Sequence, residues 1–258
     1  MHKLITLSMA LQEELERSGN KLFRYRGSIP LIFLVVGLLF HAYKSWQGTI
    51  WDKYPQYALY YELFCLLITF VGFFTRIYTV GHTPANTSGR NTAEGQVASE
   101  LNTTGIYSMV RHPLYLGNFF MWVGIALLIS DLWFVVAFCF FYWVYYERIM
   151  YAEEQFLRRK FGDVYLEWAD KTPPFIPKFS LFKKPRYSFS WKKVIKKEKN
   201  GLAAIFIIFS LFYVVGQLVK RLPIELNYLL ISCITTTVIY LILKIIKSKT
   251  HWLDEAGR

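Results

Sequence analysis

Apolar segments long enough to cross a membrane dominate the chain, and short polar breaks separate them. A membrane-spanning helix needs about 20 consecutive, mostly apolar residues. Six segments have this character: residues 28–46, 57–78, 112–129, 132–146, 202–219 and 224–246. The pattern therefore predicts an all-α, polytopic membrane protein with about six transmembrane helices.

Two tight turns are predicted between neighbouring apolar segments. Residues 114–146 form one long apolar stretch that Ser130-Asp131 interrupts in its middle. A single helix of that length would measure about 50 Å, against a hydrocarbon core of about 30 Å. We therefore expect a helical hairpin that turns at Ser130-Asp131. The last two apolar segments are expected to form a second hairpin that turns at residues 220–223.

The composition agrees with a membrane protein and excludes several other classes. Hydrophobic residues make up 54% of the chain and aromatic residues 19%, a content that fits helices in lipid with aromatic anchors at the interfaces. Disordered, collagen-like and disulfide-scaffold proteins are excluded. The three cysteines each lie inside an apolar run, so we predict neither a disulfide framework nor a cysteine metal site.

Lysine and arginine are distributed unevenly along the chain, which has a formal net charge of +12. With six spans, 26 of the 30 basic residues fall on one side of the membrane. The positive-inside rule then predicts cytoplasmic termini, in a bacterial inner membrane or an endoplasmic reticulum membrane. The basic, aromatic-rich stretch 178–199 is typical of a segment on anionic lipid headgroups. Binding of an anionic lipid substrate is the alternative, and nucleic acid is not an expected partner.

The first of two long polar segments, residues 79–111, ends at the entry of an apolar helix. Pro113 suits the first turn of that helix, where its missing N–H is no loss. Arg111 and His112 are therefore expected at a helix N-terminus, where free backbone N–H groups favour an anion. The alternative is that Arg111 reaches lipid phosphates while His112 caps the helix.

The second polar segment, residues 147–200, begins with acidic residues at the exit of an apolar helix. Glu153 and Glu154 follow that helix directly. At helical spacing Glu154 shares a face with Arg158, whereas Glu153 points elsewhere. A solvated helix with a Glu154–Arg158 pair is the alternative to a functional role for these acids.

Two motifs in this order make the sequence similar to a known superfamily. The first is Gly105-x-Tyr107-x3-Arg111-His112-Pro113-x-Tyr115-x-Gly117, and the second is Glu153-Glu154-x2-Leu157-x3-Phe161-Gly162-x2-Tyr165-x-Glu167-Trp168, followed by Pro174-x2-Pro177. Around a helical hairpin, this pattern resembles the integral-membrane methyltransferases, which include isoprenylcysteine carboxyl methyltransferases and phospholipid methyltransferases. The resemblance covers about residues 57–178.

The resemblance implies a cytoplasmic-side pocket for S-adenosylmethionine beside a membrane-facing opening for a lipid acceptor. It implies no metal. The residues that it assigns to cofactor binding are Tyr107, Arg111, His112, Pro113, Tyr115, Gly117 and Glu154. Those that it assigns to catalysis are Glu153, Glu154 and Arg148. The role of Arg148 is the least supported, because relatives carry an arginine at the position held here by Ile149.

The implied domain organisation has four regions. Residues 1–56 form an N-terminal interfacial segment and the first transmembrane helix, and residues 57–178 form the methyltransferase core. Residues 179–201 form a basic juxtamembrane linker, and residues 202–258 form a C-terminal transmembrane hairpin and tail. We expect the hairpin to support the core, with substrate selection or oligomer contact as alternatives.

The methyl acceptor and the class of protein remain open at this stage. The ending Phe175-Ile176-Pro177 favours a carboxylate acceptor, such as a prenylcysteine-like group, over a lipid phosphate or an amine headgroup. The rival functions are a six-helix transporter or channel and a non-catalytic membrane protein that binds the cofactor. Glu62 is an ionisable residue inside a predicted span, so it is a candidate for pairing with an Arg or Tyr or for contact with substrate.

Overall fold

The fold is helical throughout the described chain. The computed structural model describes residues 10–27, 29–84, 91–92, 95–255 and 257. The α-helices are α1 (Leu11–Arg24), α2 (Ile29–Gln47), α3 (Ile50–Lys53), α4 (Pro55–Gly81), α5 (Pro113–Leu127), α6 (Leu132–Phe161), α7 (Asp163–Lys171), α8 (Trp191–Lys220) and α9 (Tyr228–Lys249). Two short 3-10 helices, η1 (Ile106–Ser108) and η2 (Phe179–Leu181), and a two-residue antiparallel ladder of β1 (Asn91–Thr92) and β2 (Gly95–Gln96) complete the fold.

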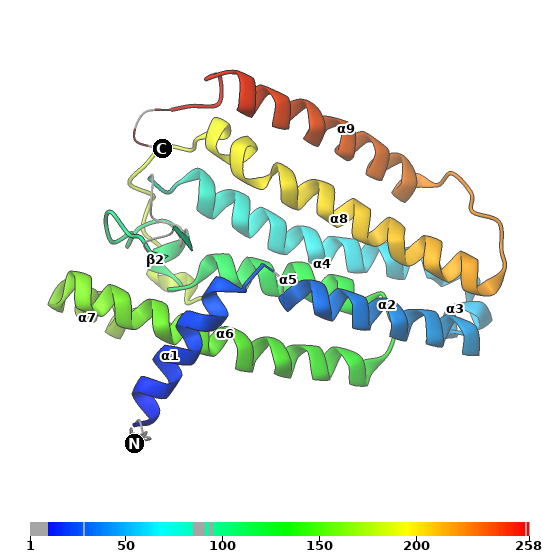
Figure 1. Cartoon of the computed structure of the whole chain (residues 1–258), viewed down its shortest axis with the longest axis horizontal. Coiled ribbons are helices and arrows are strands. Elements are labelled where there is room, and N and C mark those ends of the chain that lie inside the picture. The colour runs from blue at the N-terminus through cyan, green and yellow to red at the C-terminus, as the bar shows by residue number, and fades with distance from the viewer. Residues whose placement is uncertain (1–9, 28, 85–90, 93–94, 256, 258) are drawn as a thin grey trace, which may run out of the picture.

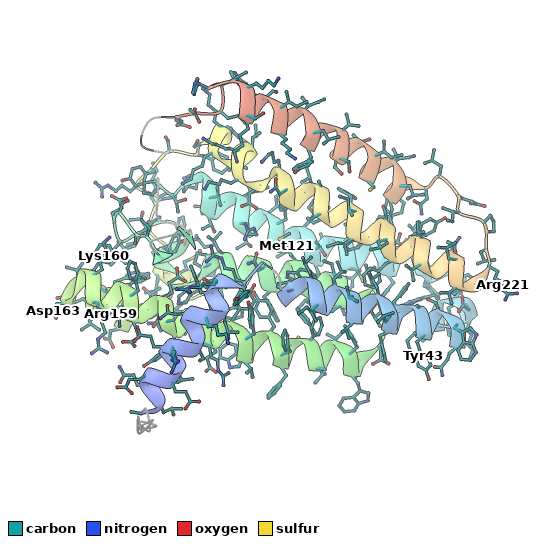
Figure 2. The ribbon with its side chains drawn as sticks, viewed as in Figure 1. Tyr43, Met121, Arg159, Lys160, Asp163 and Arg221 are labelled. Carbon is teal, nitrogen blue, oxygen red and sulfur yellow. The ribbon has the colours of Figure 1, made fainter. Side chains whose placement is uncertain are left out.

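The long helices form one elongated bundle. Helices α2, α4, α5, α6, α8 and α9 run along its length, and α1 packs across α6 (Figure 1). The first turn of α1 and the last turn of α9 both lie toward the same end of the bundle as α7 (Figure 1). We call this the polar end and define it by residues 97–112 and 161–199. Arg159, Lys160 and Asp163 lie there, whereas Tyr43 and Arg221 lie at the opposite end (Figure 2).

The structure confirms four of the six predicted spans. Helices α4, α6, α8 and α9 are long and apolar enough to cross a membrane. Predicted span 112–129 forms α5, which has 15 residues and is therefore only about 22 Å long, less than the hydrocarbon core. Predicted span 28–46 forms α2, an apolar helix of 19 residues that is not among the four. The all-α class is confirmed, and the count of six is not.

The first predicted hairpin turn is confirmed, and the second begins at its predicted position but extends to residue 227. Ser130 adopts a left-handed conformation with φ of 57°, and Asp131 then caps α6 by accepting from the backbone N–H of Phe134 at 2.9 Å. The Lys44 ammonium of α2 lies 3.1 Å from the same carboxylate. In the second hairpin, α8 ends where Arg221 turns left-handed with φ of 55°. A short polar side chain thus stops one apolar helix and starts the next.

Helices α4 and α5 approach closely through glycine. A Cβ atom at Gly72 would lie 2.3 Å from the carbonyl oxygen of Gly117, so only glycine permits this contact. Apolar side chains of α8 pack on the same pair of helices, and Phe209 and Ile205 are each only 1% exposed. The α4–α5–α8 contact therefore fixes the helix ends that carry polar side chains.

Helix α6 is a single helix of 30 residues, about 45 Å long. Its first half lies along the bundle, and its last turns reach the polar end (Figure 1). Gly162 then adopts φ of 55° and redirects the chain into α7. Because no break separates the apolar and acidic halves of α6, its packing along the bundle also fixes the acids of its last turns.

We expect Asp131→Ala to lower the free energy of unfolding by about 1 kcal/mol, because α6 loses its N-cap acceptor. Asp131→Asn keeps the cap but loses the charge that Lys44 faces, so its loss should be smaller. Thermal unfolding of the purified protein in detergent measures both. Equal stability of wild type and the alanine variant would contradict the capping role.

Candidate functional site

Backbone hydrogen bonds bring the two sequence motifs together at the polar end. The N–H groups of Arg111 and His112 donate to the carbonyls of Pro173 and Pro174 at 2.9 and 3.2 Å, and Lys178 N–H donates to the Met109 carbonyl at 3.0 Å. The segment that follows α7 therefore lies along the entry of α5. Prolines suit this arrangement, because their carbonyls accept while no N–H is left unpaired.

A compact charge network joins the start of α5 to the end of α6. The Glu154 carboxylate accepts from Arg111 Nη1 at 3.0 Å and faces His112 Nε2 at 2.8 Å. The other ring nitrogen, His112 Nδ1, lies 3.7 Å from Glu153 Oε2. His112 is only 5% exposed, so its ring is held between two acids. Charge-assisted hydrogen bonds of this kind are about twice as strong as neutral ones.

Arg111, His112 and Glu153 line a cavity of about 400 Å³, whereas Glu154 is not among its lining residues. This volume is within the size range of small-molecule sites. Its walls come from the chain before α2, from α4, from the loop 97–102, and from the ends of α5, α6, α7 and α8. The lining residues include the following charged, polar, aromatic and proline side chains: Arg26, Arg76, Tyr107, Arg111, His112, Pro113, Tyr115, Asn118, Tyr146, Glu153, Tyr165, Trp168, Lys197 and Glu198. Trp168 Nε1 donates to the Tyr107 carbonyl at 3.1 Å, so α7 closes the cavity over η1.

A second charge pair, which the sequence motifs do not contain, also lines the cavity. Arg76 of α4 donates through Nε and Nη2 to the two carboxylate oxygens of Glu198 on α8, at 2.9 and 2.8 Å. Its Nη1 donates to Asn118 Oδ1 at 2.7 Å. Glu198 is only 4% exposed. The sequence could have singled out Arg76, because an arginine inside an apolar helix is rare. No nearby residue in the sequence indicates Glu198 as its partner.

Two buried donors beside the cavity have no hydrogen-bond partner among the described residues. They are Arg111 Nε and the hydroxyl of Tyr165. Burial raises the pKa of Tyr165 above its ordinary value, and the nearby Glu154 carboxylate raises it further. The Tyr165 hydroxyl is therefore protonated at neutral pH and available to donate. Buried donors are normally paired, so this pair of donors indicates a place for an acceptor.

Tyr107 is also a neutral phenol in the cavity. Burial raises the pKa of its hydroxyl, and the Glu153 carboxylate adds to the effect, while Arg76 acts in the opposite sense. Tyr107 thus lies within electrostatic reach of both walls. It links the acidic side, where Glu153 lies, to the basic side, where Arg76 lies.

Three local expectations at this site are corrected. The backbone N–H groups of Arg111 and His112 are not free for an anion, because they donate to proline carbonyls. The His112 side chain does not cap α5, and Arg111 pairs with Glu154. Glu154 itself binds these two residues, so the expected i, i+4 pair with Arg158 is not its main interaction. In each case a tertiary partner replaces the local one.

The remaining predicted site residues divide between the cavity and the packing around it. Pro113 occupies the first turn of α5, as predicted, and lines the cavity together with Tyr115. Gly117 instead faces α4, where an added Cβ would lie 2.7 Å from Arg76 Cγ. Arg148 does not line the cavity and donates to its own helix at the Val144 carbonyl, at 3.1 Å. Ile149, beside it, is fully buried.

Glu62 lies away from this cavity. Its carboxylate accepts from the hydroxyl of Tyr228 on α9, so the expected partner is a tyrosine. Fourteen residues of α4 separate it from Arg76, which corresponds to about 21 Å along the helix. Glu62 therefore ties α4 to the C-terminal hairpin at the other end of the bundle.

Comparison with known proteins shows that the central part of the chain is similar to membrane methyltransferases. A family model described as phospholipid methyltransferase matches residues 61–164. Protein-S-isoprenylcysteine O-methyltransferase of Saccharomyces cerevisiae is 33% identical over 116 residues, which make up 44% of this chain and 47% of that relative. Over this region the chain is similar to integral-membrane methyltransferases. Both site motifs begin within the matched region, whereas α8 and α9 lie outside it.

Two further similar proteins have names that refer to metal resistance. Nickel-cobalt-cadmium resistance protein NccN of Alcaligenes xylosoxydans xylosoxydans is 35% identical over 34% of this chain and 41% of its own length. Cobalt-zinc-cadmium resistance protein CzcN of Cupriavidus metallidurans is 27% identical over 82% of this chain and 91% of its own length. The chain thus spans less than half of NccN and of the yeast enzyme. No solved structure matches.

A metal centre is not evident in the described regions of the chain. Among those residues, no group of three or more His, Cys, Asp or Glu side chains is placed to hold a metal ion. Glu154 instead pairs with Arg111 and His112, and Glu153 lies near His112.

Gly117→Ala should destabilise the protein by about 1–3 kcal/mol, because the new methyl group overlaps both Arg76 Cγ and the Gly72 carbonyl. Gly27→Ala is the matched control, because an added Cβ there meets nothing within 4 Å. Thermal unfolding in detergent compares them. Equal melting of the two variants would refute the close α4–α5 contact.

Proposed function

We propose that the protein transfers a methyl group from S-adenosylmethionine to a lipid or lipidated acceptor embedded in the membrane. The observation that carries the proposal is the cavity itself. It lies at the polar end of the helical bundle, in a chain similar to phospholipid methyltransferases, and two of its lining residues carry buried donors without a partner among the described residues. Its size of about 400 Å³ suits a small-molecule ligand.

The residues present fit the polar groups of this cofactor. The Arg111 Nε and Tyr165 hydroxyl donors, which lack a partner among the described residues, match the two acceptor oxygens of a carboxylate. The Glu153 carboxylate, which lines the cavity, is an acceptor for an ammonium group or for ribose hydroxyls. Tyr107 and Tyr115 offer aromatic faces to the adenine ring or the sulfonium cation.

The chain contributes alignment and a dry site rather than covalent chemistry. The bound cofactor supplies an electrophilic methyl group on a sulfonium, and transfer requires an in-line approach of the acceptor. The Glu154–Arg111–His112 network holds the ends of α5 and α6 in place, and α7 covers the cavity through the Trp168–Tyr107 hydrogen bond. An oxygen acceptor that is already anionic needs no general base, whereas an amine would need one, such as Glu153.

The orientation and the domain limits belong to the proposal as well. The excess of basic residues near the polar end favours a cytoplasmic location for that end and for both termini. The methyl donor would then enter from the cytoplasm and the acceptor from the bilayer. Residues 57–178 form the methyltransferase core, flanked by residues 1–56, the basic stretch 179–201 and the hairpin 202–258. Relatives named O-methyltransferases favour an oxygen acceptor over an amine.

The first test is transfer of labelled methyl from S-adenosylmethionine into an extract of host membrane lipids by the purified protein. We expect label in one lipid species, which mass spectrometry identifies. Glu154→Gln should weaken cofactor binding at least tenfold, because Arg111 and His112 lose their charged partner and no longer hold the cavity.

Arg148→Ala is the matched control on the same helix, because Arg148 does not line the cavity. Its effect on cofactor affinity, measured by calorimetry, should stay within about twofold, since only a bond to the Val144 carbonyl is lost. No methyl transfer and no cofactor binding by wild type would overturn the proposal in favour of a transporter. Binding without turnover would indicate a non-catalytic member.

A further inference from the structure

The start of α8 contributes to the cavity although it lies outside the matched family region. Lys197 and Glu198 line the cavity, and both belong to the stretch for which the sequence predicted a lipid belt. Glu198 is buried, and its carboxylate holds Arg76 through two hydrogen bonds. The C-terminal hairpin is therefore joined to the core at the site itself, not only through apolar packing.

The Arg76 guanidinium is fixed but not saturated. A guanidinium carries five N–H donors, and three of them are engaged by Glu198 and Asn118. The two remaining N–H groups, one on each terminal nitrogen, have no acceptor among the described residues. Arg76 is 23% exposed and lines the cavity, so a ligand can reach them. A guanidinium held rigidly in this way loses little entropy when it binds an oxyanion.

The surroundings of Arg76 favour an anionic headgroup with an apolar tail. Arg26 and Lys197 also line the cavity, so three cationic side chains contribute to its walls. Tyr146 lies within electrostatic reach of both Arg26 and Arg76. The same tyrosine lines a small apolar cavity behind it, together with Phe33, Trp122 and Phe138. Tyr146 therefore lies between the charged cavity and the small apolar one.

We propose that Arg76, held by Glu198, orients an anionic oxygen of the membrane acceptor, a phosphate or a carboxylate, and that Glu198 is a positioning residue supplied by the C-terminal hairpin. This inference rests on the proposed function, because it assigns the acceptor side of the same cavity. The donor side, formed by Arg111, Tyr165 and Glu154, is separate from it. The hairpin thereby selects the substrate class.

The test measures binding of three amphiphiles that share one alkyl chain, namely hexadecyl phosphate, palmitate and hexadecanol. The protein is held in phosphatidylcholine nanodiscs, with and without S-adenosylhomocysteine, at a pH where the carboxylate is ionised. Calorimetry should show that wild type binds at least one anion tenfold or more tightly than the alcohol, because two charge-assisted hydrogen bonds form only with an anion. The preferred anion distinguishes a lipid phosphate from a lipidated carboxylate.

Arg76→Lys and Glu198→Gln should each lose at least tenfold of this anion preference while retaining affinity for S-adenosylhomocysteine. Arg76→Lys keeps the charge, so it remains informative if Glu198→Gln unfolds. Tyr228→Phe is the matched control, because it cuts another tie between α4 and the hairpin far from the cavity, and it should keep the full preference.

Three results would overturn the inference. They are no anion preference in wild type, an unchanged preference in Arg76→Lys, and a loss of S-adenosylhomocysteine affinity in place of anion affinity. Failure of the proposed function has a different signature, namely no binding of S-adenosylhomocysteine by wild type, and the anion preference can still be measured in that case.

Discussion

The polar end of the bundle depends on the contact between the Glu154 carboxylate and the Arg111 and His112 side chains. Glu154 lies near the end of the long helix α6, and its two partners precede α5, so one carboxylate joins the ends of both helices. The His112 ring is buried between Glu153 and Glu154. Because half-buried charges need partners, this network holds together the elements that form the cavity, whose walls include Arg111 and Tyr165.

A second, independent tie attaches the C-terminal hairpin to the family core. Arg76 and Glu198 are 122 residues apart in the chain, and both line the cavity. Gly117 makes this possible, because its missing side chain leaves room for the aliphatic portion of Arg76. The matched region ends before α8, so a segment outside the shared core completes the cavity.

The sequence predicted the features that depend on local chemistry. Ser130 and Asp131 were the only polar break in a long apolar run, and they form the turn and the N-cap of α6. Pro113 starts α5 as its fixed backbone geometry demands. The motifs around Arg111 and Glu154 indicated one site because each ends or begins an apolar helix. The predicted count of spans was less successful, because hydropathy marks apolar helices and does not measure their final length.

Tertiary structure alone decided which partner each charged side chain has. By itself the sequence determined the helical class, the hairpin turns, the membrane setting and the family resemblance, since these follow from hydropathy, capping and motifs within a few turns of chain. It favoured Glu154–Arg158, a pair one helical turn apart, whereas packing brought Arg111 and His112 closer. The sequence did not predict a partner for Arg76, and it did not indicate a role for Glu198. The reason is physical: a buried charge pair forms where packing brings two helices together, and no local pattern records that distance.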